Sequence, residues 1–285
     1  METIAQTVVN GFVLSSIYIL VAVGFALIFS LVQILNFAHG VIYMIGAYLC
    51  YYCGVVFRLD PWAAVLMSAL IVGLFGLFLE RFLFRPLHGD FNRTLMVALA
   101  LIVIFQTAAD VTVGAYVKRV PSILPGVVSI AGVSLSRERV MAFGIAICLL
   151  SALTLLIRKT MIGKQMLALA QDREAASLQG INVHRVVAFA FAVSCGLAAV
   201  AGGLMGSIVT LYVYMGDSML VKAITLVIVA GMGSIGGLFV SGLLIGFIDA
   251  ILPTFIGGAG SDAVGFAFVI LILLIKPQGF FGHEV

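Results

Sequence analysis

A few polar residues in an otherwise apolar chain are the first candidates for chemistry. Between Glu2 and Arg58 the sequence contains no Asp, Glu, Lys or Arg, yet Asn36 and His39 interrupt that run within ILNFAHGVIYMIGAY. An ionisable group inside such a stretch is costly and is usually turned toward a partner or a cavity. No second ionisable residue lies near His39 in the sequence, so a proton relay is not indicated. We expect its imidazole to brace a neighbouring helix carbonyl, with substrate contact as the alternative.

Other reactive groups do not form a recognisable catalytic pattern. The four cysteines, Cys50, Cys53, Cys148 and Cys195, all lie in apolar segments and are interpreted as small buried thiols. The sequence shows no metal-ligand cluster, and no G-x-x-x-x-G-K-[ST] loop for a nucleotide. A nucleophile–base pair is also missing. We therefore expect neither a bound metal nor a cofactor on this chain, and no enzymatic activity of its own.

The composition is that of a membrane protein. Of 285 residues, 63% are hydrophobic and 9% are charged, whereas soluble domains carry about 25% charged residues. A helix needs about 20 apolar residues to cross a bilayer, with its backbone hydrogen bonds satisfied internally. Apolar windows with at most one charged residue predict an all-α polytopic fold with eight to nine transmembrane helices, at residues 8–31, 40–57, 62–79, 95–116, 140–157, 186–209, 221–232, 237–253 and 263–275.

Basic residues predict the orientation, because cytoplasmic loops carry an excess of Lys and Arg. Nine basic residues lie in 80–93, in 158–185 and at Lys276, against six on the opposite side, where Lys222 is counted. With nine spans, the N-terminus is then outside and the C-terminus inside. The N-terminus lacks the positive region of a secretory signal, so the first span is expected to be retained. Residues 1–285 are expected to form a single transmembrane domain.

The connections are short except at two places. Residues 117–137 contain Pro121, Pro125 and Gly126 and predict an outside loop with a short hairpin around VVSIAGVSL. On the other side, residues 158–185 include a helical pattern at Met166, Leu169 and neighbouring positions, which Gly180 is placed to end in left-handed geometry. This pattern predicts one short amphipathic helix between two spans.

Two apolar segments are interrupted by small or polar residues. The first break is Asn36–Gly40, and the second, in GMGSIGG, is Gly231–Gly237. Interrupted spans in transporters often mark the substrate pathway, because backbone can leave helical geometry in a membrane only beside protein or a water-filled cavity. Close helix packing is the alternative for the glycines, as in the pairs Gly202/Gly206 and Gly242/Gly246. The residues we place on a translocation path are Gln33, Asn36, His39, Gly40, Gln106, Gly233, Ser234 and Gly236.

Two further acids lie in predicted spans. Asp110 and Asp249 are both near the outer end of their windows, where exposure to lipid headgroups is as plausible as a functional role.

The residues EAASLQG, Glu174–Gly180, match the EAA-x-x-x-G core of the loop by which permeases of ATP-binding-cassette importers dock on their ATPases. The Ile-x-Leu-Pro that follows it in maltose-type permeases is absent. Together with NFAHGVIYMIGAY, RPL (85–87), ALAQDREAASLQGIN, AAVAGGLMG, GMGSIGG and KPQGFFG, this segment resembles the branched-chain amino-acid (Liv-type) permeases, in particular their smaller H-type subunit. The resemblance extends from about residue 10 to 282.

The resemblance implies a passive half of a translocation path in the cell (inner) membrane. Its partners would be a related permease subunit in a heterodimer, two cytoplasmic ATPases that bind the ATP, and an extracytoplasmic substrate-binding protein. It implies ATPase coupling through Asp172, Arg173, Glu174, Ala175, Ala176, Leu178 and Gly180. The expected substrates are branched-chain or related amino acids. The same importer class carrying urea, amides, aromatic or organic acids remains an alternative, as does an ion-coupled secondary transporter.

Overall fold

A computed structural model shows a helical protein with one small hairpin. It describes residues 2–33, 35–87, 89–114, 117–120, 122, 124, 126–130, 133–231, 233–276 and 278–281. The long helices are α1 (Glu2–Val32), α3 (Pro61–Leu79), α4 (Phe91–Val113), α5 (Arg137–Lys159), α8 (Val183–Ile208) and α10 (Ile235–Ile256). The shorter helices are α2 (His39–Val55), α6 (Met161–Gln171), α7 (Arg173–Leu178), α9 (Met215–Ala230) and α11 (Gly258–Ile275). A π-helical turn, Glu80–Phe84, and a 3₁₀ turn, Arg85–Leu87, extend α3.

The helices agree with the apolar windows. Each of the nine windows falls on a separate helix, and six helices in the described part of the chain are long and apolar enough to cross a membrane. The other three windows fall on α2, α9 and α11, which are shorter. The chain is therefore a multi-pass membrane protein.

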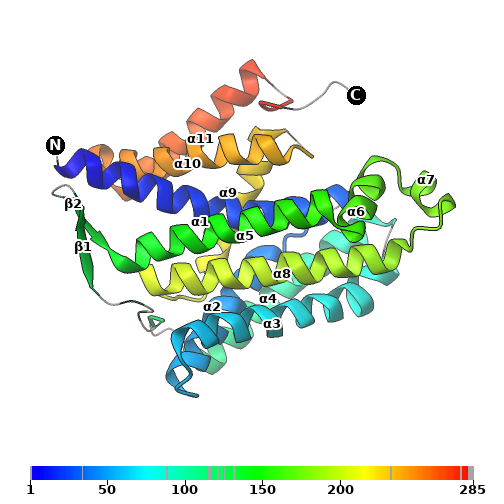
Figure 1. Cartoon of the computed structure of the whole chain (residues 1–285), viewed down its shortest axis with the longest axis horizontal. Coiled ribbons are helices and arrows are strands. Elements are labelled where there is room, and N and C mark those ends of the chain that lie inside the picture. The colour runs from blue at the N-terminus through cyan, green and yellow to red at the C-terminus, as the bar shows by residue number, and fades with distance from the viewer. Residues whose placement is uncertain are drawn as a thin grey trace.

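The long helices run side by side along the long axis of the molecule, whereas α9 crosses them (Figure 1). The N-terminus and the strands β1 (Val127–Ile130) and β2 (Val133–Ser136) lie at one end, and α6 and α7 lie at the other (Figure 1). The strands pair antiparallel, with Val127 opposite Ser136, which confirms the predicted hairpin. Pro121 and Pro125 lie outside the described residues.

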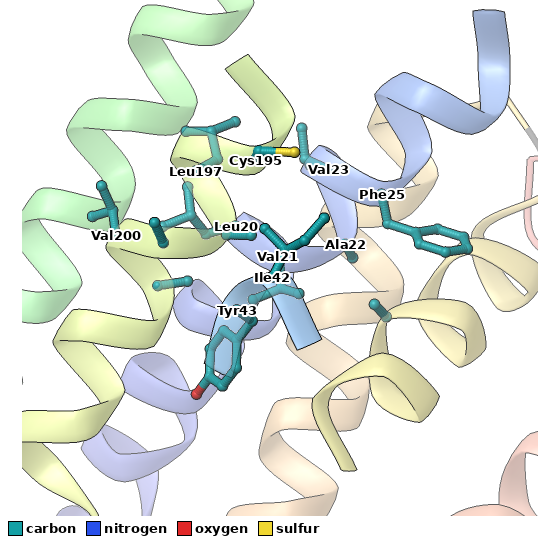
Figure 2. Close-up of a cluster of buried hydrophobic side chains, with 14 of the residues drawn as sticks. Leu20, Val21, Ala22, Val23, Phe25, Ile42, Tyr43, Cys195, Leu197 and Val200 are labelled. Atoms are coloured by element: carbon teal, nitrogen blue, oxygen red, sulfur yellow. The ribbon is translucent and has the colours of Figure 1, made fainter. Parts of the chain in front are cut away.

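The centre of the molecule lies where α1, α2 and α8 meet (Figure 2). Small residues let these helices approach: Gly46 of α2 packs on the backbone of Ala199, and Gly202 of α8 packs on the carbonyl of Tyr43. Gly242 and Gly246 of α10 similarly pack closely against Ile19 and Ser15 of α1. In a membrane this dispersion-driven packing of small residues takes the place of hydrophobic exclusion from water. The packing interpretation of Gly202, Gly242 and Gly246 is confirmed.

Some sequence predictions need correction. Cys148 is exposed, whereas all four cysteines were interpreted as buried thiols. The segment after α5 is not one helix: Asp172 has extended backbone (φ −153°, ψ 113°) and separates α6 from α7. The Asp172 side chain also stabilises this corner between α6 and α7, because it accepts hydrogen bonds from the backbone N–H groups at the start of α7. Lys222 was counted among the six basic residues on the outer side of the membrane, but it lies within α9. An ion pair inside the helix bundle explains its position, as described below.

Candidate functional site

The first interruption separates α1 from α2. After Val32 the chain takes a left-handed turn at Gln33 (φ +55°) and resumes helical geometry at His39. His39 and Gly40 therefore belong to the first turn of α2, and the break itself consists of residues 33–38. Asn36 within it is buried, and neither polar atom of its amide has a hydrogen-bond partner in the described part of the chain.

His39 joins the beginning of α2 to the middle of α1. It is fully buried, and its Nε2 lies 3.2 Å from the carbonyl oxygen of Val21, to which it must donate. The imidazole also meets the ring of Phe25 edge-on, with centroids 5.8 Å apart. Val21 precedes the end of α1 by three turns, about 16 Å along the helix axis. The start of α2 thus lies alongside the middle of α1, and the geometry at His39 is that of a brace.

Gly40 lies at a crossing of two helices rather than in a cavity. A Cβ on Gly40 would meet the carbonyl oxygen of Gly216 in α9, and a Cβ on Gly216 would meet the carbonyl of Gly40. Only hydrogen atoms fit on both sides of this contact. The residue therefore fixes how closely α2 and α9 approach.

The second interruption separates α9 from α10. Gly231 (φ +89°) and Gly233 (φ +91°) adopt backbone conformations that other residues rarely reach. Ser234 caps α10, its hydroxyl accepting from the backbone N–H of Gly237 at 3.0 Å. Gly236 is already in the first turn of α10, so the break is shorter than the sequence predicted.

The C-terminal residues reinforce this second break. The backbone N–H groups of Phe280 and Phe281 donate to the carbonyls of Val229 and Ala230, at 2.8 and 3.0 Å. Gly279, with φ +77°, approaches the backbone of Gly231. These contacts satisfy carbonyls that the end of α9 leaves free. They give a structural role to the ending KPQGFFG, of which Pro277 and Gly282 lie outside the described residues.

The two breaks meet beside α6. A cavity of about 560 Å³, here called the α6 cavity, is lined by Phe29, Ser30, Gln33, Leu167, Ala170, Gln171 and Gly233. A smaller adjoining cavity also contacts Ser234. The structure thus brings together Gln33, Gly233 and Ser234 from the predicted path. Asn36, His39 and Gly40 lie in the packed interior, and Gln106 lies apart, donating to Asp217 at 2.7 Å.

The predicted coupling residues form the corner between α6 and α7. Asp172 caps α7 by accepting from the backbone N–H groups of Glu174 and Ala175, at 2.9 and 3.0 Å. Within α7, Ala176 is buried, whereas Glu174 is exposed and Leu178 is 88% exposed. An apolar side chain so accessible at the tip of a short helix is a candidate contact for another protein.

Gly180 ends α7 as the sequence predicted. It has φ +81°, and the N–H groups of Gly180 and Ile181 donate to the carbonyls of Ser177 and Ala176. This pair of bonds is the Schellman ending of a helix, which requires a left-handed residue. The shape of the corner is therefore fixed at both of its ends, by Asp172 and by Gly180.

Sequence reasoning did not find two partly buried ion pairs. Lys222 of α9 lies 2.7 Å from Asp249 of α10, which also accepts from the hydroxyl of Tyr18 in α1 at 2.9 Å. Glu80 is fully buried and is held by two bonds from Arg85, 2.7 and 3.1 Å long. Asp249 is thus paired within the bundle rather than exposed to headgroups. For the pair of Lys222 and Asp249, the available signal was a charge of opposite sign in each of two apolar windows.

Comparison with known proteins identifies the family of the chain. Residues 7–275 match the family model described as "Branched-chain amino acid transport system / permease component". The chain is 32% identical to the high-affinity branched-chain amino acid transport system permease protein BraD of Pseudomonas aeruginosa, over 98% of this chain and 95% of BraD. It is 30% identical to LivH of Salmonella typhimurium and of Escherichia coli strain K12, with the same coverage. Over 43% of its length it is also 30% identical to the ribose import permease protein RbsC of Haemophilus influenzae. No solved structure matches it. The chain belongs to the family of permease components of branched-chain amino acid transport systems.

Proposed function

We propose that the chain is a permease subunit of an ATP-binding-cassette importer and forms half of the path for branched-chain or related amino acids. The relatives BraD and LivH are named as permeases of high-affinity branched-chain amino acid transport systems, and they match nearly the whole chain. The substrate would be delivered by an extracytoplasmic binding protein. ATP would be bound and hydrolysed by two separate cytoplasmic subunits, with no cofactor on this chain.

The observation that carries the proposal is the position of α6. One end of the α6–α7 corner presents Glu174 and Leu178 to solvent, where an ATPase can bind. The other face of α6 lines the α6 cavity through Leu167, Ala170 and Gln171, opposite both helix breaks. Because a packed helix moves as a body, displacement of the corner by ATPase closure would reshape this cavity.

The orientation belongs to the same proposal. The α6–α7 corner, the turn after α3 and Lys276 would face the cytoplasm, and the N-terminus and the hairpin would face outside. Removing Lys222 from the outer set leaves nine basic residues against five, which supports this orientation more strongly than the sequence count did. We propose nine spans in the cell (inner) membrane, paired with a homologous permease subunit.

An ion-coupled transporter is the less favoured alternative. Such a protein would need a carboxylate near the centre that can exchange its counter-ion. Asp249 forms an ion pair with Lys222 and accepts a hydrogen bond from Tyr18. These bonds indicate a structural role rather than exchange of a transported ion. Uptake driven by an ion gradient, measured with the single chain in liposomes, would favour this alternative. Urea, amides and aromatic or organic acids remain alternative substrates.

A charge reversal at the corner tests the coupling. Glu174→Lys should leave membrane insertion intact but uncouple ATP hydrolysis from uptake, because Glu174 is exposed on α7. ATP hydrolysis and uptake are measured together in vesicles that contain the complete complex. Asp60→Lys is the matched control: Asp60 is exposed next to the start of α3, and its substitution reverses the charge at the opposite end of the molecule. This variant should transport normally. Normal uptake by Glu174→Lys would count against the assignment.

A cysteine-accessibility scan tests the path. Single cysteines at 33–40 and 231–237, in a chain without its native cysteines, should react with a hydrophilic thiol reagent where water reaches the breaks. Cysteines at Leu70 and Val103, which are exposed on the apolar surface, serve as lipid-facing controls. Labelling no greater than at these controls would refute a path through the breaks.

A further inference from the structure

A polar cavity, separate from the α6 cavity, lies at the hairpin end of the molecule. This polar cavity has a volume of about 220 Å³ and is lined mainly by polar side chains, among them Asn10, Arg119, Ser136, Glu138 and Arg139. They come from α1, from the segment after α4, from the end of β2 and from the start of α5. None of them belongs to the predicted translocation path or to the coupling corner.

The charged side chains around the polar cavity do not pair with one another in the described part of the chain. Glu138 is 7% exposed, and its Oε1 has no hydrogen-bond partner in the described part of the chain. Arg139 donates to the amide oxygen of Asn10, and Arg119 donates to the carbonyl of Ser207 at 3.2 Å, so both guanidinium groups are bonded to neutral acceptors. Among the described residues, none of the three belongs to an ion pair.

Helix capping does not account for this arrangement. Glu138 lies in the first turn of α5, where a carboxylate is favoured by the helix dipole. That effect operates equally on an exposed side chain and gives no reason to bury the group. A buried carboxylate is costly unless a cation or hydrogen-bond donors compensate it. The missing partner is therefore expected to be a ligand with a positive group.

An apolar cavity adjoins the polar one. It has a volume of about 200 Å³ and shares Asn10, Arg139 and Ile208 with its neighbour. Its other walls include Val13, Leu14, Met205 and Pro253. Asp249 also lines it, but that carboxylate is already bonded to Lys222 and Tyr18. The combined volume of the two cavities lies at the lower end of the range for ordinary small-molecule sites, about 300–1,000 Å³.

We propose that these two cavities form a receiving site for a zwitterionic α-amino acid with an apolar side chain. Arg119 and Arg139 bind its carboxylate, Glu138 binds its ammonium group, and the apolar cavity accepts its side chain. Charge-assisted hydrogen bonds of this kind are the strong ones, and they hold both ends of the zwitterion in a fixed orientation. This proposal rests on the proposed function, because it gives an importer a site at the face where the binding protein would release its substrate.

The test uses the full-length chain in reconstituted membranes, with Cys148→Ser and a reporter at Ser136→Cys. Ser136 lines the polar cavity. L-leucine should slow modification of the reporter by a membrane-impermeant methanethiosulfonate. L-leucinamide, which lacks the carboxylate, and 4-methylpentanoate, which lacks the ammonium group, should protect far less. Equal protection by all three compounds, or protection by none, would overturn the proposal.

Charge removal then assigns the groups. Glu138→Gln and Arg119→Gln should each raise the leucine concentration for half-protection roughly ten- to a hundredfold, as expected for a lost hydrogen bond to a charged group. Glu138→Gln should also abolish the preference for leucine over 4-methylpentanoate, and Arg119→Gln should reduce the preference over leucinamide, because Arg139 still contacts the carboxylate. Arg137→Gln, next to Glu138 but outside the cavity lining, is the matched control. Unchanged preferences in both variants would overturn the assignment.

This result is distinguishable from failure of the proposed function. Leucine protection of the reporter without ATP-dependent uptake by the assembled complex would support the site and reject the importer. ATP-dependent leucine uptake that is unaffected by Glu138→Gln and Arg119→Gln would reject the site and leave the importer intact.

Discussion

His39 shows how one polar side chain can hold an apolar structure together. Its bond to the carbonyl of Val21 ties the start of α2 to the middle of α1, and its ring packs on Phe25. His39→Ala should lower the free energy of unfolding by about 3 kcal/mol, through the lost ring packing and hydrogen bond. Thermal unfolding of the purified chain in detergent measures the effect.

A conservative replacement separates the brace from substrate contact. His39→Gln keeps an N–H donor near the position of Nε2, so it should retain most of the stability and the transport that His39→Ala loses. An His39→Ala chain that unfolds like the wild type yet fails to transport would instead indicate contact with the substrate.

Gly40 carries a second prediction at this scale. Gly40→Ala places a Cβ against the backbone of Gly216, which has no side chain to rotate away. We expect a loss of about 3 kcal/mol, at the upper end of overpacking costs. Gly144→Ala in α5 is the control, because a Cβ there meets nothing within 4 Å. Equal stability of the two variants in thermal unfolding would show that the α2–α9 crossing is not tightly packed.

The sequence could show that these residues were unusual but not what they contact. His39 was identifiable as a brace because a solitary histidine in an apolar run has few other stable arrangements. The contact of Gly40 with Gly216 was not identifiable, since the two glycines are remote in sequence and neither differs from glycines that pack elsewhere. Glu138 was missed for a similar reason: in the sequence it is an ordinary acid at the start of a helix.

At the scale of elements, the α6–α7 corner is a separate unit with an exposed apolar tip. Leu178 is 88% exposed, so Leu178→Ser should change the stability of the chain by less than about 0.5 kcal/mol. If the tip seats in an ATPase, the same substitution should reduce the amount of ATPase that co-purifies in mild detergent. Leu155→Ser, on the exposed apolar side of α5, is the comparison. Unchanged recovery of the ATPase would place the contact elsewhere on the corner.

The ion pair between α9 and α10 supports a prediction about helix packing. Lys222→Met or Asp249→Leu alone should destabilise the chain by about 3 kcal/mol, because each removes one partner of an ion pair whose side chains are only 14% and 11% exposed. The double variant should recover most of that loss. Thermal unfolding of the three variants gives the coupling energy, and additive effects would show that the two charges do not interact.

Element boundaries were predicted well where one physical rule dominated. The apolar windows were located correctly because a bilayer leaves a single chain segment few options other than a helix. The corner was predicted as one helix because the apolar spacing continues through Asp172, and periodicity does not report that a short carboxylate can cap a new helix instead. The position of the start of α2 beside the middle of α1 had no counterpart in the hydropathy pattern.

For the whole molecule, the arrangement of the ends predicts which residues face which compartment. In intact cells, a membrane-impermeant maleimide should label a cysteine at Ser122, beside the hairpin, but not one at Ser177 in α7. Inverted vesicles should show the opposite pattern. Both chains need Cys148 replaced, because it is exposed. Labelling of Ser177→Cys from outside would reverse the proposed orientation and remove the corner from the reach of a cytoplasmic ATPase.

The shortness of α2 has a consequence for how the protein is made. This helix ends at residue 55, and the helix that covers its glycine-rich face, α8, begins only at residue 183. With 17 residues it is at the lower limit for crossing a bilayer unaided. A nascent chain therefore leaves the translocation machinery with this face of α2 still uncovered, and α2 can complete its packing only after most of the polypeptide has been synthesised. Truncation before α8 should consequently yield a fragment that cellular quality control removes.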